Sequence, residues 1–301
     1  MHRSLDSAPD IESGRKDFWG ANQPGFKFAT APVGTREFYR QVSAHRYSLE
    51  PHILEMADFA AWMNHDVLEV GCGIATDGAR FAEAGARYCG LDFAGPALEL
   101  ARRRFALFEL PGSFVEADAT ELPFPDASFD LVYSHGVIHH IRDTERAIDE
   151  FHRVLRPGGT AIVMLYHRRS LNYVFTILTL RRLLAGTLLI PGGLRVAARI
   201  TGEESAMLQG HRDLLRQHGM RYVVDSSLFL SKNTDGPANP LSKVYSRGQA
   251  VRMFSAFRTV ETEVRYLNLR IYPGGEGLAT TSLARRLERR VGWHLYVRTR
   301  T

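Results

Sequence analysis

The period of the hydrophobic pattern changes repeatedly from residue 66 onward. Short apolar runs rich in β-branched residues alternate with stretches in which apolar residues recur at helical spacing. This alternation is typical of α/β proteins with a parallel sheet. The runs predict about seven strands, at residues 66–70, 86–92, 112–118, 129–134, 160–166, 259–269 and 293–299.

Helices are expected between these strands. The clearest is 142–155, in which Ala147, Ile148 and Phe151 share one face. The sequence Pro-Gly-Gly at 157–159 is expected to stop that helix. The other expected helices are 79–84, 95–107 and 247–257.

Two regions lie outside this alternation. Residues 34–62 carry apolar residues at helical spacing and predict one or two amphipathic helices before the sheet. Residues 167–246 are apolar, punctuated by Gly and Pro, and too many for a simple connection. We therefore expect three parts: an N-terminal helical cap at 1–62, an α/β core at 63–166 and 247–301, and a helical insertion at 167–246.

One segment of the insertion, 171–190, is long enough to span a bilayer. Its centre holds Arg181 and Arg182, and each Arg at the middle of a span costs about 2.5 to 3.5 kcal/mol. We therefore expect no membrane span. The segment is expected to be a buried or interfacial helix, either a lid over a pocket or the contact surface of a homodimer.

The composition is that of a folded globular chain. Of 301 residues, 45% are apolar and 24% are charged, which is far from the composition of disordered chains. The 38 basic and 33 acidic residues leave a net charge of +5, and the basic doublets are scattered, so no nucleic-acid partner is expected.

The cysteines and the N-terminus bear on the compartment. Cys72 and Cys89 cannot form a disulfide framework or a thiolate metal site. The first residues contain no apolar core of signal-peptide length. Both features predict a cytoplasmic protein.

A glycine-rich turn follows the first expected strand, with the sequence EVGCGIA at 69–75. Glycines at such a turn let the backbone approach a ligand at the amino end of the next helix, and an acidic residue that ends the neighbouring strand can accept both hydroxyls of a ribose. Asp92 ends the next strand, 19 residues after Gly73. A tight turn without a ligand is the other interpretation of a lone G-x-G.

The rest of the segment favours a ligand. Asp118 ends the third expected strand, LPFPDASFDLVYS leads into the fourth, GVIHH follows it, and HRVLRPGG precedes the fifth. With these motifs in this order, residues 66–166 resemble the class I S-adenosylmethionine-dependent methyltransferases, in the small-molecule, UbiE-like (type 11) pattern. A nicotinamide dehydrogenase is the rival interpretation, but it needs a glycine at Thr76 and leaves Asp118 unexplained.

The resemblance implies a Rossmann-like, seven-stranded, mostly parallel sheet, with S-adenosylmethionine as cofactor and S-adenosylhomocysteine as product. It also implies a role for each matching position. Glu69, Gly71 and Gly73 surround the methionine part, Asp92 binds the ribose, Phe93 packs against the adenine, Asp118 and Ala119 receive the adenine amino group, and Ser134 and His135 line the sulfonium. Ala75 departs from the pattern, because the family usually has a third glycine there.

Methyl transfer from a sulfonium needs mainly in-line alignment and a dry site. An oxygen or carbon acceptor also needs a base, and His139 and His167 are the candidate catalytic residues because they follow the fourth and fifth strands. A metal site built on His135 and His139 finds no carboxylate or thiol at a matching offset, so no metal is expected.

The acceptor is expected to be a small molecule held beneath the N-terminal helices and the insertion. The stretches MLYHRRSLNY and NPLSKVYS look like those of methyltransferases in bacterial secondary-metabolite and cell-surface biosynthesis. A peptide or RNA methyltransferase and a non-catalytic cofactor-binding protein are the alternatives.

Overall fold

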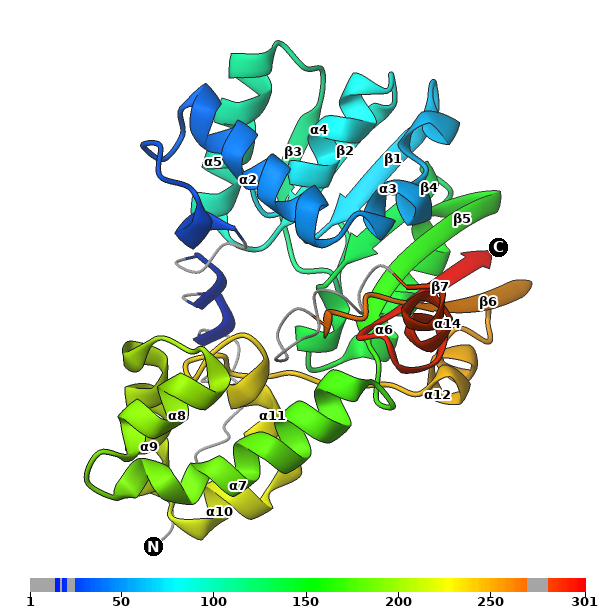
Figure 1. The fold of residues 1–301 in the computed structure, drawn as a ribbon. Helices are drawn as coiled ribbons and strands as arrows, with labels where there is room; N and C mark the ends of the chain where they lie inside the picture. The colour runs from blue at the N-terminus through cyan, green and yellow to red at the C-terminus, as the bar shows by residue number, and fades with distance from the viewer. Residues whose placement is uncertain (1–13, 17, 21–24, 270–280) are drawn as a thin grey trace, which may run out of the picture. The chain divides into compact units, whose positions relative to one another are not determined.

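The computed structural model describes residues 14–16, 18–20, 25–269 and 281–301 (Figure 1). The chain divides into two compact units. The sheet unit comprises Trp19–Leu165, Arg247–Glu263 and Leu295–Thr301, and the insertion unit comprises Met1–Phe18, Tyr166–Ser246 and Val264–His294.

Seven strands form one sheet, in the order β3-β2-β1-β4-β5-β7-β6. The pairs β1–β2, β1–β4, β2–β3 and β4–β5 are parallel, which confirms the predicted Rossmann-like, mostly parallel sheet. The strands are β1 (Asp66–Val70), β2 (Arg87–Asp92), β3 (Ser113–Glu116), β4 (Phe129–His135), β5 (Leu155–Tyr166), β6 (Thr259–Arg265) and β7 (His294–Arg300).

Three strands differ in extent from the prediction by more than one residue. β6 ends at Arg265 instead of residue 269. β3 ends at Glu116, so Asp118 lies in the turn beyond it. β5 begins at Leu155 instead of residue 160, because Leu155 already has an extended backbone and pairs with Phe129. The register then shifts, with Leu131 opposite Thr160, so the Pro-Gly-Gly sequence is accommodated in an irregular part of the strand and does not itself stop the helix.

Helices of the sheet unit cover the sheet near β1–β3 (Figure 1). α4 and α5 pack on β2, and α2 lies against both of them. The two predicted helices before the sheet are α2 (Arg36–Leu49) and α3 (His52–Ala57). The other helices of this unit are α4 (Thr76–Glu83), α5 (Gly95–Phe108), α6 (Thr144–Val154) and α12 (Arg247–Met253).

The insertion is helical, as predicted, and has an apolar core of its own that includes Tyr173, Ile177, Leu215 and Phe229. No described helix is long and apolar enough to cross a membrane. The helical segments of the insertion are η4 (Asn172–Arg181), α7 (Arg182–Ala185), η5 (Gly186–Leu189), α8 (Gly193–Thr201), α9 (Ser205–His218), α10 (Met220–Val224) and α11 (Ser226–Thr234). The insertion unit also contains α14 (Ser282–Val291), which the hydrophobic pattern did not predict.

Candidate functional site

The turn after β1 folds back onto the end of β2. The backbone N–H groups of Gly71 and Cys72 donate to the Leu91 carbonyl at 2.7 and 3.0 Å. The Gly73 N–H donates to Asp92 Oδ2 at 2.8 Å. Gly71 has φ +77°, and a Cβ at that position would lie 2.3 Å from a methyl carbon of Val137, so glycine is required there.

The Asp92 side chain joins the turn after β1 to the residues that follow β2. Its second oxygen, Oδ1, accepts the N–H of Ala94 at 2.9 Å, and the side chain is buried. The carboxylate therefore joins the turn after β1 to the residue that precedes α5.

The positions after β2 and β3 lie at the same edge. Asp92 pairs with Glu116 in the parallel ladder, and the N–H of Ala117 donates to the Asp92 carbonyl at 3.1 Å. Phe93 follows β2 and is half-buried. Asp118 lies two residues beyond β3, where its Oδ1 accepts the Thr120 N–H at 2.7 Å, and Ala119 is buried beside it. The structure therefore brings these predicted positions to the same edge.

Ser134 and His135 end β4. The Ser134 hydroxyl is buried and has no hydrogen-bond partner among the described residues. His135 Nδ1 lies 3.2 Å from an Arg46 nitrogen, and its Nε2 lies 2.9 Å from the Tyr296 hydroxyl. Because arginine can only donate, Nδ1 accepts, and Nε2 of the neutral ring carries the proton and donates to Tyr296.

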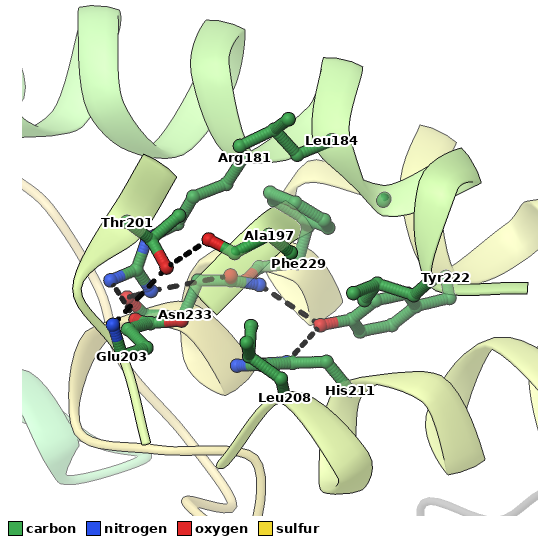
Figure 2. Close-up of a pocket in the computed structure, with 12 residues that line it drawn as sticks. Arg181, Leu184, Ala197, Thr201, Glu203, Leu208, His211, Tyr222, Phe229 and Asn233 are labelled. Carbon is green, nitrogen blue, oxygen red and sulfur yellow. Dashed lines mark hydrogen bonds and ion pairs between the residues drawn. The ribbon is translucent and has the colours of Figure 1, made fainter. Parts of the chain in front are cut away.

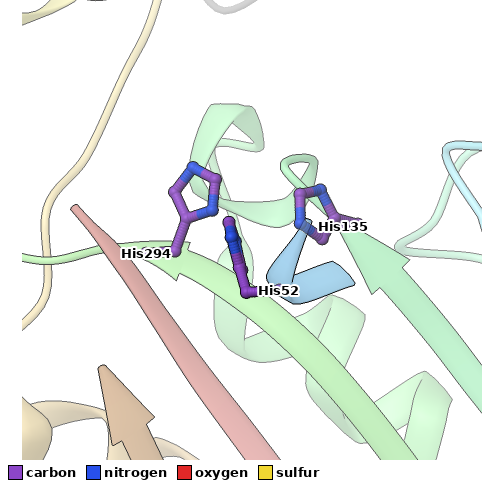
Figure 3. A group of neighbouring side chains, drawn as sticks. All are labelled: His52, His135 and His294. Atoms are coloured by element: carbon purple, nitrogen blue, oxygen red, sulfur yellow. The ribbon is translucent and has the colours of Figure 1, made fainter. Parts of the chain in front are cut away.

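The environment keeps His135 uncharged. Burial lowers the pKa of His135 well below its ordinary value, and the positive charge of Arg46 and the neighbouring His52 lower it further. Of the three imidazoles drawn in Figure 3, His52 and His135 belong to the sheet unit and His294 belongs to the insertion unit. His135 therefore orients its neighbours as a neutral donor and acceptor and is a poor base.

A buried carboxylate that the sequence did not single out organises this side of the site. Asp77, in the first turn of α4, accepts two bonds from Arg46, at 2.8 Å from Nε and 2.6 Å from Nη2. The hydroxyls of Tyr47 and Tyr133 each donate to it at 3.0 Å. Four bonds saturate the carboxylate, and through Arg46 they also fix the ring of His135.

The charge of Asp77 is stabilised where it lies. Burial alone would raise the pKa of Asp77, but the attraction of Arg46 and the hydrogen bonds from Arg46 and the two tyrosines hold it below its ordinary value. No local pattern in the sequence indicates this network, because Arg46 and Tyr133 lie 31 and 56 residues from Asp77.

Glu69 lies beneath the turn. It is buried and accepts a hydrogen bond from the Tyr88 hydroxyl of β2 at 2.6 Å. Burial raises the pKa of Glu69, and the negative charge of Asp77 raises it further. This carboxyl therefore joins β1 to β2 as a hydrogen-bonded group.

The two candidate bases belong to different units. His139, in η3 (Ile138–His140) of the sheet unit, is fully buried, with its ring centroid 4.3 Å from that of His140. His167, in the insertion unit, is also buried, and its Nδ1 lies 3.0 Å from the Gly292 carbonyl. A carbonyl only accepts, so Nδ1 of His167 carries the proton and Nε2 is the basic nitrogen of the neutral ring.

Comparison with known proteins concerns mainly the segment that carries this site. A family model described as "Methyltransferase domain" matches residues 68–163. The demethylmenaquinone methyltransferase of Thermus thermophilus is 45% identical over 80 residues, which cover 27% of this chain and 36% of that protein. The sterol 4-C-methyltransferase of Caenorhabditis elegans is 32% identical over 118 residues, covering 38% of this chain and 35% of that protein.

The chain spans about a third to a half of the length of the curated relatives that it matches. Two solved structures share the fold over nearly the whole chain. The [4+2]-cyclase SpnF has a TM-score of 0.52 and 13% identity, covering 100% of this chain and 99% of its own. A protein from Pyrococcus horikoshii has a TM-score of 0.50 and 16% identity, covering 91% and 94%.

The position of the missing third glycine gives a test of backbone strain. Ala75 has φ 52° and ψ 51°, in the left-handed region. That conformation costs a residue with a Cβ about 1 to 2 kcal/mol, and the added freedom of glycine in the unfolded chain offsets part of it. Ala75→Gly should raise the free energy of unfolding by about 0.5 to 1 kcal/mol in urea denaturation.

Ala79 lies inside α4, the helix that Ala75 precedes, and it is the matched control for Ala75→Gly. Ala79→Gly should lower the free energy of unfolding by about 1 kcal/mol, because glycine weakens a helix interior. Equal destabilisation by both changes would show that Ala75 is not strained.

The Asp77 network predicts a large cost for losing its charge. Asp77→Asn removes the nearer of the two carboxylates that pair with Arg46 and leaves only Glu50 at 3.8 Å, and the loss should be about 3 kcal/mol in the free energy of unfolding. Glu83→Gln, on the same helix but in an exposed pair with Arg80, should change it by about 0.5 kcal/mol or less. Similar small losses for both variants would contradict a structural role for the network.

Proposed function

Because residues 68–163 are a methyltransferase domain of the class I S-adenosylmethionine-dependent kind, we propose that this chain transfers a methyl group from that cofactor to a small-molecule acceptor. One observation supports the proposal more than any other. The acidic residue that ends β2 is tied directly to the glycine turn after β1, through Asp92 and Gly73. A ligand with a ribose and a charged end fits such an edge.

The residues present fit the cofactor. The Ser134 hydroxyl is fully buried without a partner among the described residues, as expected of a group that completes its hydrogen bonds on a ligand. Asp92 is an acidic residue at the end of β2, the position from which a carboxylate can accept ribose hydroxyls. The residues that would hold the cofactor are Glu69, Gly71, Gly73, Asp92, Phe93, Asp118, Ala119, Ser134 and His135.

S-adenosylmethionine, when bound, supplies an activated methyl group, so the chain itself must align the acceptor and exclude water. A hydroxyl or carbon acceptor would also lose a proton to a base. Nε2 of His167 is one candidate to accept it, since Nδ1 carries its own proton toward the Gly292 carbonyl. His139 is the other. The neutral ring of His135 donates to Tyr296. It would stay in that hydrogen bond and would not take the proton from the methyl acceptor.

The names of two relatives support a small-molecule acceptor. These two are described as acting on demethylmenaquinone and on a sterol, both small and largely apolar molecules. We place the acceptor of this chain in the same broad class, in bacterial secondary-metabolite or cell-surface biosynthesis. A peptide or RNA acceptor, or cofactor binding without catalysis, are the alternatives.

An assay with radiolabelled methyl donor separates these possibilities. The full chain is incubated with labelled S-adenosylmethionine and panels of quinols, phenols and sterols, and with a tRNA mixture and a peptide library. Label in a small molecule is the expected result. Label only in RNA or peptide would contradict the acceptor class, and tight cofactor binding with no labelled product would contradict the enzymatic function.

Replacing the acidic residue at the end of β2 tests the cofactor site. Asp92→Ala should weaken binding of S-adenosylhomocysteine by about 1.5 to 3 kcal/mol in calorimetry, the cost of losing hydrogen bonds to a charged group. Asp149→Ala, an exposed change on α6, should leave the affinity unchanged. Because Asp92 also holds Gly73, unfolding of each variant is measured in parallel. Unchanged affinity in folded Asp92→Ala would remove Asp92 from the site.

The base is tested once an acceptor is known. The Ala variant of whichever histidine is the base, His139 or His167, should lose about 10²-fold or more of the methyl-transfer rate while cofactor affinity is kept. His152→Ala, on α6, is the control. If both variants keep nearly full turnover, alignment alone drives transfer, and the acceptor is already a nucleophile, such as an amine or a carboxylate.

A further inference from the structure

The helix α14 of the insertion unit exposes both apolar and basic side chains. Ala284 is the one residue of this helix that is buried. Leu283 is 60% exposed and Leu287 is 40% exposed, and because they are four residues apart they form one apolar stripe along the helix. The helix also carries exposed arginines, which are Arg285, Arg286, Arg289 and Arg290.

Two of these arginines lie directly beside the leucine stripe. Arg286 follows Leu283 by three residues, Arg290 follows Leu287 by three, and side chains at this spacing are neighbours on a helix surface. The stem of an arginine is aliphatic and can lie along an apolar layer while its charged end stays in a polar one. We call the surface formed by Leu283, Arg286, Leu287 and Arg290 the leucine–arginine face.

An arginine in the interior of the same unit has partners there. The unit contains a small pocket whose walls include Arg181, Glu203, His211 and Asn233 (Figure 2). Arg181 is paired with the Glu203 carboxylate and donates to the Asn233 carbonyl at 2.9 Å. The charge of Arg181 is therefore balanced within the unit.

The arginines of the leucine–arginine face have no such counter-ion in the part of the chain that the structure describes. The side chains of Arg286 and Arg290 form no hydrogen bond or ion pair with a described residue. Glu288 is the acidic residue of α14, and one of its carboxylate oxygens accepts the backbone N–H of Tyr266 at 2.8 Å. The face therefore presents positive charge outward, next to exposed leucines.

A partner for this face must be negatively charged and must also take aliphatic side chains. A second copy of the same face would place arginines opposite arginines. RNA pairs its phosphates with arginines but stacks its bases on aromatic side chains, which α14 lacks. The interface of a bilayer with anionic lipids suits both kinds of residue, because its phosphates lie at the surface and its acyl chains lie directly beneath them.

We propose that α14 binds to the surface of a bilayer that contains anionic phospholipids. Leu283 and Leu287 enter the interface, Arg286 and Arg290 lie at the level of the lipid phosphates, and the helix axis is parallel to the membrane plane. The helix lies on the bilayer and does not cross it, because its 10 residues are too few for a span. This binding uses neither a methyl donor nor a methyl acceptor, so it holds or fails independently of the proposed methyl transfer.

Co-sedimentation of the full chain with lipid vesicles tests this binding. One set of vesicles contains equal parts of phosphatidylcholine and phosphatidylglycerol, and the other contains phosphatidylcholine alone. We expect the chain to sediment with the anionic vesicles, to stay in solution with the neutral ones, and to be released at about 1 M salt, where the screening length is about 3 Å. Equal binding to both vesicles, or binding to neither, would overturn the proposal.

A pair of arginine variants assigns the binding to α14. Arg286→Gln combined with Arg290→Gln should weaken binding to the anionic vesicles about 25-fold, because each arginine near such a surface contributes a factor of about 5. Arg36→Gln combined with Arg40→Gln is the matched control, since it removes the same charge from two exposed positions four residues apart on α2. An equal loss in the control would show that overall charge drives the binding, which would overturn the assignment to α14.

The leucines separate a bilayer from the other partners. Leu283→Gln combined with Leu287→Gln should weaken vesicle binding about 10-fold or more. The free energy of unfolding should stay nearly the same, because both side chains are exposed and glutamine forms helices about as well as leucine. Vesicle binding that this variant keeps in full would contradict insertion of the leucines. Binding of a tRNA mixture or formation of a dimer through this face, without vesicle binding, would likewise overturn the proposal.

Discussion

The hydrogen bond from the Gly73 N–H to the Asp92 carboxylate is the constraint on which the site depends. The parallel strands β1 and β2 end at the same edge of the sheet. The chain must turn there without covering that edge. Because Gly71 has no Cβ, the turn can pass close to the side chain of Val137. Asp92 then fixes both the turn and the residue that precedes α5. That tie adds a side-chain bond to the backbone bonds that Gly71 and Cys72 donate to Leu91, and together they fix the turn relative to the end of β2.

A buried network of charged side chains also fixes residues of the site. Asp77 is saturated by Arg46 and two tyrosines, and the same guanidinium fixes the tautomer of His135. Burying ions is expensive, and it is tolerated here because each charge has several directed partners. The result is a set of side chains whose protonation and orientation are settled before any ligand arrives, which is how a protein limits the reorganisation that a reaction requires.

The sequence predicted the parts of the structure that local patterns encode. β1 and α5 were placed within a residue of their bounds, because a buried strand and an amphipathic helix each repeat over a few residues. The Asp77 network joins residues far apart in the chain, and no short window contains it. α14 was missed because it is rich in arginine and buries only Ala284, so few apolar residues mark the segment. The pocket around His211 depends on helix packing that periodicity does not specify.

The central claim is that the edge formed by the turn at 71–75 and the residues after β2 binds the cofactor. Because one fold can support different chemistry, the claim must be tested at these residues. Hydrogen–deuterium exchange of the full chain, with and without S-adenosylhomocysteine, does this most directly. The account predicts slower exchange at 71–76 and 92–94 on ligand addition. Unchanged exchange there, or protection confined to the helices of the insertion, would contradict it.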